Sequence, residues 1–134
     1  LVCDGQGRAH PRGLGLASHV GLWLDLPTVG CAKSRLCGEH DEVGPNRGDS
    51  VPLLLNGRVV GCVLRTRDGV KPLYISPGHM IDNKGAKSLV LDSCTRYRLP
   101  EPTRLAHHAA GFRGRECDLL PELVKMLTRV RKSR

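Results

Sequence analysis

The chain has 134 residues, a formal net charge of +8 and a sequence pI of about 9.6. That length fits one domain with a sizeable buried core. The 21 Lys and Arg residues against 13 Asp and Glu residues favour a polyanionic partner, but a merely soluble basic surface has the same charge. No signal peptide is visible and no apolar run reaches the length of a membrane span, so we expect no contact with a membrane.

The six cysteines do not follow a disulfide or metal-binding spacing. Several lie within apolar patterns, which favours buried free thiols in a reducing compartment and therefore a cytoplasmic location. Cys31, Cys37 and His40 could form a partial zinc set, but their spacing matches no standard pattern. The cysteines are Cys3, Cys31, Cys37, Cys62, Cys94 and Cys117.

Residues 1–33 predict a strand, a glycine-rich loop, a helix and a second strand. Leu1 to Asp4 is apolar without alternation, as at the end of a buried parallel strand. Gly13 to Leu24 has the apolar period of a helix, and Thr28 to Ala32 is short and β-branched. The order strand, helix, strand predicts a βαβ crossover.

Polar residues follow both of these predicted strands. Asp4 ends the first strand, Lys33 follows the second, and His10 lies in the loop between them. Ligands of open α/β sheets bind outside the carboxyl ends of the strands. We therefore expect the carboxylate, the lysine and the histidine to gather at one edge.

The middle of the chain predicts antiparallel strands that extend the same sheet. Val51 to Leu55 and Arg58 to Arg65 flank Asn56-Gly57, the strongest short hairpin signal in the sequence. Lys71 to Ser76 is a third strand, which Pro77-Gly78-His79 is expected to end. Ser34 to Cys37 is predicted as a short helical turn.

Helices follow toward the end of the chain. Asp82 is expected to cap a helix that runs to about Tyr97 with Leu89 facing inward, and Thr103 to cap one that runs to Ala110. Leu119 to Val130 is amphipathic and precedes a basic end. That end could touch nucleic acid, although a frayed, solvated terminus is the more common outcome.

Three ordered segments carry a resemblance to a known family. They are DGQGRAHPRGLGLASHVGLWLDLPTVGCAK, RGDSVPLLLNGRVVGCVLRTRDGVKPLYISPGH and YRLPEPTRLAH, and they cover most of the chain up to His108. In this order they resemble endonuclease V, the deoxyinosine 3′ endonuclease. The resemblance implies an α/β fold, a ribonuclease H-like mixed sheet with flanking helices whose amino-terminal strands are missing. It divides the chain into residues 1–110, part of the catalytic domain, and residues 111–134, a basic helical tail.

The resemblance also implies a function. It is that of a metal-dependent endonuclease of nucleic-acid repair, which cleaves a phosphodiester bond 3′ of deoxyinosine in DNA or inosine in RNA. The implied cofactor is Mg²⁺, with Mn²⁺ as a substitute. The implied partner is DNA or RNA that contains deaminated adenine, and no obligate protein partner is expected.

The same resemblance assigns roles to single residues. Asp4 is implied as a metal ligand, with His79 as a second candidate, because carboxylates hold the ion that polarises a phosphate. The lesion pocket is implied at Gly5, Gly7 and Leu36, since amides of side-chain-free residues can read the edge of a flipped base. The implied catalytic residues are Asp4, His10, Lys33 and His79.

Each role has a structural alternative when the residues are taken alone. A strand-end Asp4 is equally able to cap loop amides, and Lys33 could be an ordinary solvated lysine. His79 could be a satisfied surface histidine, and Gly5 and Gly7 an ordinary glycine turn. The residues by themselves leave these alternatives open.

A second function class follows from the carboxylates that the family carries before the segment at Leu1. One aspartate without those partners should bind Mg²⁺ weakly. The alternative is therefore a catalytically incomplete nucleic-acid-binding fragment, with salt-sensitive binding and no metal-dependent cutting. A misfolded product with an exposed sheet edge is a third possibility.

Overall fold

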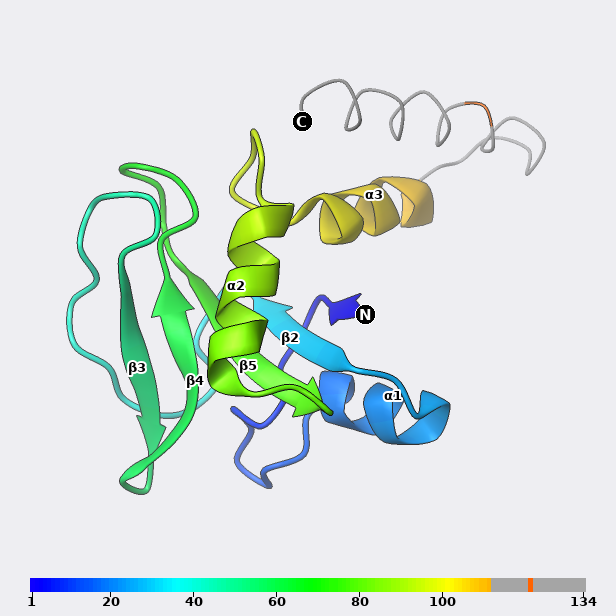
Figure 1. Cartoon of the computed structure of the whole chain (residues 1–134), viewed down its shortest axis with the longest axis horizontal. Helices are drawn as coiled ribbons and strands as arrows, with labels where there is room; N and C mark the ends of the chain where they lie inside the picture. The colour runs from blue at the N-terminus through cyan, green and yellow to red at the C-terminus, as the bar shows by residue number, and fades with distance from the viewer. Residues whose placement is uncertain (112–120, 122–134) are drawn as a thin grey trace.

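The computed structural model describes residues 1–111 and residue 121. Their main feature is a five-stranded sheet in the order β1-β2-β5-β4-β3. Three helices flank it (Figure 1). The strands are β1 (Val2–Cys3), β2 (Thr28–Ala32), β3 (Ser50–Leu55), β4 (Arg58–Leu64) and β5 (Leu73–His79), and the helices are α1 (Leu16–Leu24), α2 (Asn83–Ser93) and α3 (Glu101–Ala110).

The sheet is mixed, as predicted. β1 pairs with β2 in parallel across the α1 crossover, which confirms the βαβ unit. β5 pairs antiparallel with β2 on one side and with β4 on the other, so the hairpin continues the same sheet. The arrows of β2 and β5 point in opposite directions (Figure 1), so the end of one strand lies beside the start of the other.

Helix α1 begins later than its apolar pattern predicts. The expected start was Gly13, but the helix begins at Leu16 because Gly13 has a φ of +69° and Gly15 is extended. The helix ends at Leu24, where Asp25 takes a left-handed φ of 51°. The predicted second strand, Thr28 to Ala32, is confirmed residue for residue.

The hairpin is confirmed at the predicted turn. Asn56 and Gly57 both have positive φ, at 52° and 73°, which is the conformation that a two-residue hairpin turn requires. His79 stands at the end of the third strand, as predicted, but the expected bounds Lys71 to Ser76 were wrong, because β5 starts at Leu73 and includes Pro77-Gly78-His79. Pro77 pairs with Val29 next to a register shift between Thr28 and Val29, and such irregularities are where sheets tolerate proline.

The predicted cap of α2 is confirmed, since the Asp82 carboxylate accepts from the Gly85 amide over 2.7 Å. Two details were wrong. The helix ends at Ser93 rather than near Tyr97, and Leu89 is 40% exposed. At this end the Arg47 guanidinium donates to the carbonyls of Leu91 and Cys94, so a distant side chain satisfies carbonyls that the helix leaves without a partner.

Two further local predictions were wrong. Ser34 to Cys37 is irregular, with bends at Ser34 and Cys37, and forms no helical turn. Helix α3 starts at Glu101 after Pro100, so Thr103 is a buried residue within the helix and not its cap. The predicted tail helix, residues 119–130, and most of the 111–134 segment lie outside the described residues.

The two faces of the sheet pack against different parts of the chain. Helix α2 covers one face, where Ala86 and Val90 join Val29, Cys31 and Ile75 in the larger core cluster. The neighbouring positions of each strand point the other way. There α1 covers Thr28 and Gly78, and the loop before it covers Gly30. Over the described range, no helix has both the length and the apolar composition needed to cross a bilayer.

Candidate active site at the carboxyl ends of β1 and β2

Asp4 and Lys33 meet where the two parallel strands end. The Lys33 ammonium lies 3.2 Å from the Asp4 carboxylate, and the two side chains are 41% and 45% exposed. Cys3 is in register with Gly30, so the parallel pairing brings Asp4, the next residue, level with the last residues of β2 and within reach of the long Lys33 side chain. The expected meeting of carboxylate and lysine at one edge is thus present.

Two distant side chains bind the main chain at this point. Arg98, in the connector between α2 and α3, donates from Nη2 to the Lys33 carbonyl over 3.2 Å. Gln6 donates from Nε2 to the Ser34 carbonyl over 3.2 Å, and its own carbonyl oxygen is buried without a partner among the described residues. Sequence reasoning missed both residues, because contacts 65 and 28 positions apart leave no local pattern.

His10 lies in the loop before α1 and is half-buried. Its Nδ1 accepts from the Arg12 amide over 3.1 Å. The neighbouring Ala9 packs with Val43 and Val63 on the sheet face that the loop crosses. Across residues 1–111, no hydrogen bond or ion pair joins the His10 side chain to Asp4 or Lys33.

The structure does not bring His79 to Asp4 and Lys33. His79 ends β5 and is in register with Thr28, the first residue of β2. Lys33 follows Ala32, the last residue of that strand. Five positions along a strand separate these points by roughly 16 Å. His79 instead lies 3.5 Å from the Asp25 carboxylate at the end of α1. The antiparallel direction of β5 causes this separation, because its carboxyl end lies at the opposite edge of the sheet.

The proposed lesion residues also differ in their surroundings. Gly7 is buried, and its amide donates to Ser76 Oγ over 2.8 Å, so that amide is already occupied. The Gly5 amide has no such partner within the described range, and a Cβ there would meet only Leu16 at 3.4 Å. Leu36 is 55% exposed. Gly5 and Leu36 are therefore accessible to a ligand, and Gly7 is not.

The described residues do not by themselves fit a magnesium centre. Mg²⁺ takes six oxygen ligands in octahedral geometry, usually from one or two carboxylates, substrate phosphates and several waters. Asp4 offers one exposed carboxylate that already contacts Lys33. In residues 1–111 there is no group of three His, Cys, Asp or Glu side chains that could hold a metal ion. Asp4 can thus supply at most part of such a site.

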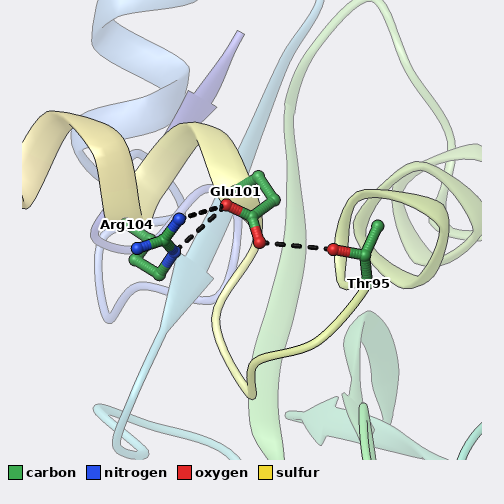
Figure 2. Close-up of polar contacts among 3 residues, drawn as sticks. All are labelled: Thr95, Glu101 and Arg104. Atoms are coloured by element: carbon green, nitrogen blue, oxygen red, sulfur yellow. Dashed lines mark hydrogen bonds and ion pairs between the residues drawn. The ribbon is translucent and has the colours of Figure 1, made fainter. Parts of the chain in front are cut away.

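Helix α3 is held beside this edge by its own polar cluster (Figure 2). Glu101 is only 6% exposed and accepts two hydrogen bonds from Arg104, at 3.0 and 2.7 Å. Its other oxygen accepts from Thr95 over 3.3 Å. The Arg104 guanidinium also lies 4.5 Å from the centre of the Tyr97 ring. This cluster ties the start of α3 to the connector that carries Arg98.

The edge with Asp4 and Lys33 lies inside a segment that matches a known family model. The endonuclease V model matches residues 1–108. The chain belongs to the endonuclease V family. An endonuclease V of Azotobacter vinelandii is 56% identical over 114 residues, which is 85% of this chain and 52% of that protein. One of Nostoc punctiforme is 56% identical over 83% of this chain and 50% of that protein.

Solved endonuclease V structures have the same fold. The Streptomyces avermitilis enzyme superimposes with a TM-score of 0.76 at 46% identity, over 80% of this chain and 47% of that one. A Ciona intestinalis endonuclease V, solved with DNA containing an inosine followed by a ribo-adenosine, gives 0.64 at 26% identity over 80% and 51%. The fold is therefore α/β and ribonuclease H-like, as predicted. The chain spans about half the length of the curated relatives it matches.

Proposed function

We propose that this chain carries part of the active site of a metal-dependent endonuclease that acts in nucleic-acid repair. It cleaves a phosphodiester bond 3′ of deoxyinosine in DNA or of inosine in RNA. The observation that carries the proposal is the exposed Asp4–Lys33 pair at the carboxyl ends of two parallel strands, within the family segment. A relative solved with inosine-containing DNA supports this choice of substrate.

Each residue at this edge has a proposed role that its position allows. Asp4 supplies one oxygen ligand of a divalent ion, which when bound polarises the phosphate. The Lys33 ammonium binds a phosphate oxygen and stabilises the negative charge that builds there. Asp4 and Lys33 then act on one phosphate, since their charged atoms are 3.2 Å apart.

Gly5 and Leu36 are proposed to contact the flipped base. Hypoxanthine has a carbonyl where adenine has an amine, so a main-chain N–H that donates to this position favours hypoxanthine over adenine. The Gly5 amide is such a donor and follows Asp4 directly. His10 is proposed to contact the nucleic-acid backbone from the loop before α1. The roles implied by resemblance for Gly7 and His79 are not part of this proposal.

The test is cleavage of a single-stranded oligonucleotide that contains one deoxyinosine, with Mg²⁺ and with EDTA. The whole chain is assayed alone and together with the other half of the Azotobacter vinelandii protein. Cutting that needs Mg²⁺ and is lost in Asp4→Asn supports the proposal. Normal cutting by Asp4→Asn contradicts it. So does a folded chain that does not cut in Mg²⁺, either alone or with the other half of the Azotobacter vinelandii protein.

The second candidate is a catalytically incomplete nucleic-acid-binding fragment. It is favoured by the incomplete metal site, since the described residues offer no group of three ligands. This candidate predicts that the chain binds the oligonucleotide, that affinity falls steeply with salt, and that EDTA changes nothing. Binding without cutting, in both assay conditions above, would select it.

A further inference from the structure

We propose that Arg98 is a positioning residue that holds the main chain at Lys33 and thereby keeps the Lys33 ammonium beside Asp4. This inference deepens the proposed function and rests on it for the role of Lys33. The positioning itself can be measured without nucleic acid.

The Arg98 guanidinium binds three main-chain carbonyls from two separate segments. Its Nε donates to the Lys71 carbonyl over 2.7 Å, and its Nη2 donates to the carbonyls of Pro72 and Lys33 over 3.0 and 3.2 Å. Lys71 and Pro72 precede β5, and Lys33 follows β2. The last register pair between these strands is Ala32 with Tyr74, so Arg98 continues their connection where the ladder stops.

The other end of Arg98 is fixed to the core. Its carbonyl accepts from Thr66 Oγ1 over 2.6 Å and from Cys94 Sγ over 3.5 Å, and both of these residues are fully buried. A side chain that starts from a buried anchor and ends on Lys33 limits the positions that the Lys33 main chain can take. Gln6 limits the next residue in the same way, through the Ser34 carbonyl.

The residue type matches this task. A guanidinium is planar and carries five N–H donors in a fixed fork, whereas a lysine ammonium is one compact charge on a flexible stem. Lys33 has such a flexible stem and is 41% exposed, so its side chain does not by itself fix the ammonium. The position of the Lys33 main chain therefore determines the region that the ammonium can reach. Loss of Arg98 should therefore release Lys33 from Asp4 even though Arg98 touches neither charged group.

The experiment measures how fast each lysine of the folded chain is acetylated by trace acetic anhydride, read by peptide mass spectrometry from pH 7 to pH 10. Lys84 on α2 is the internal reference, because it is exposed and far along the chain from this edge. Asp4→Asn sets the rate of a Lys33 that has lost its partner. In Arg98→Gln we expect the Lys33 rate to rise about threefold, the size of effect that an exposed ion pair can supply. In the double variant of Arg98→Gln and Asp4→Asn we expect the same Lys33 rate as in Asp4→Asn alone.

The matched control is Arg47→Gln. Arg47 also donates its guanidinium to main-chain carbonyls, at Leu91 and Cys94, but it closes α2 instead of contacting Lys33. We expect this variant to lose stability and to leave the Lys33 rate unchanged. An equal rise in both variants, or no rise in a folded Arg98→Gln chain, overturns the proposal.

Arg98→Lys provides a second variant in case Arg98→Gln does not fold. It retains one charge but not the fork, so we expect an intermediate Lys33 rate. Failure of both variants to fold would show that Arg98 supports the whole domain, and this too overturns the proposal. A chain that shows the expected rates but never binds the oligonucleotide would reject the proposed function and leave the positioning intact.

Discussion

The buried amide of Gly7 donates to Ser76 Oγ over 2.8 Å, across 69 positions of sequence. This bond fastens the loop after β1 to the middle of β5. The Gly7 carbonyl meanwhile accepts from the Gly15 amide at the start of α1. Gly7 thus joins the loop, the sheet and the helix, and this structural role accounts for a glycine that the family resemblance assigns to the lesion pocket.

The first prediction concerns Gly7→Ala. A Cβ at this position would lie 2.2 Å from the Pro77 carbonyl oxygen, a main-chain atom that cannot move aside cheaply. We expect this overpacking to lower the free energy of unfolding by about 3 kcal/mol, as measured by urea denaturation. Gly5→Ala is the control and should change it by less than about 1 kcal/mol, because its Cβ makes ordinary contact with Leu16. Equal stability losses in the two variants would argue against the arrangement described for this loop.

The second prediction uses Gly5→Ala for binding. If the Gly5 amide reads the base, a methyl group beside it should weaken binding of a deoxyinosine oligonucleotide roughly fivefold, the value of one hydrogen bond of about 1 kcal/mol. Binding of a matched adenine oligonucleotide should not change. Fluorescence anisotropy with both oligonucleotides measures the difference. A uniform loss on both would assign Gly5 to backbone contact instead of base recognition.

The third prediction separates His79 from the site. His79 lies at the Thr28 end of β2 and its Cβ packs near Gly21, so His79→Ala should cost about 1–2 kcal/mol of stability. It should leave oligonucleotide binding unchanged at a temperature where the variant is folded. Lys33→Ala is the comparison, and it should weaken binding. It should also reduce the slope of log affinity against log salt concentration by about 1, as the loss of one phosphate contact does. Reduced binding in a folded His79→Ala chain would restore a role for His79.

The fourth prediction concerns the buried carboxylate of Glu101. Glu101→Ala leaves Arg104 and Thr95 without their partner beside α3 (Figure 2), and we expect a loss of about 2 kcal/mol in the free energy of unfolding. Arg104→Lys should cost less, because it keeps the charge but loses the second hydrogen bond and the contact with Tyr97. Chemical denaturation ranks the two variants. The reverse order would mean that Arg104 stabilises α3 mainly through Tyr97.

The fifth prediction concerns the buried thiols and alkaline pH. Burial raises the pKa of Cys31 to about 12, and those of Cys62 and Cys94 to about 11, from a reference value of 9.0. Between pH 9 and these values the unfolded chain loses thiol protons that the folded chain keeps. The contribution of these thiols to the free energy of unfolding is therefore fully present below pH 9. It falls as the pH rises, by about 1 kcal/mol per thiol at pH 10.

Urea denaturation at pH 8 and pH 10 measures this fall, with Cys62→Ala as the control. The control should lose less stability between the two pH values than the wild-type chain, because one thiol no longer titrates. An identical loss would show that the Cys62 thiol titrates alike in both states. Alkylation followed by peptide mapping should also modify the half-buried Cys37 before Cys31, Cys62 and Cys94.

The sequence by itself determined the local elements and the family. Three local elements were predictable because each has its signal within a few residues. They are the β-branched strand Thr28 to Ala32, the Asn56-Gly57 turn, whose residues tolerate positive φ, and the Asp82 cap, whose side chain is an acceptor. The meeting of Asp4 with Lys33 was also predictable, since parallel strands joined by one helix end at the same edge.

Only the tertiary structure decided the rest of the site. It separates His79 from Asp4 because β5 pairs antiparallel with β2, and the residues of a strand do not show which strand it will pair with. It occupies the Gly7 amide with Ser76 and places the Arg98 guanidinium on the Lys33 carbonyl. These contacts join residues 69 and 65 positions apart, and they form only when the packed sheet brings the donors to the carbonyl and hydroxyl oxygens that accept from them.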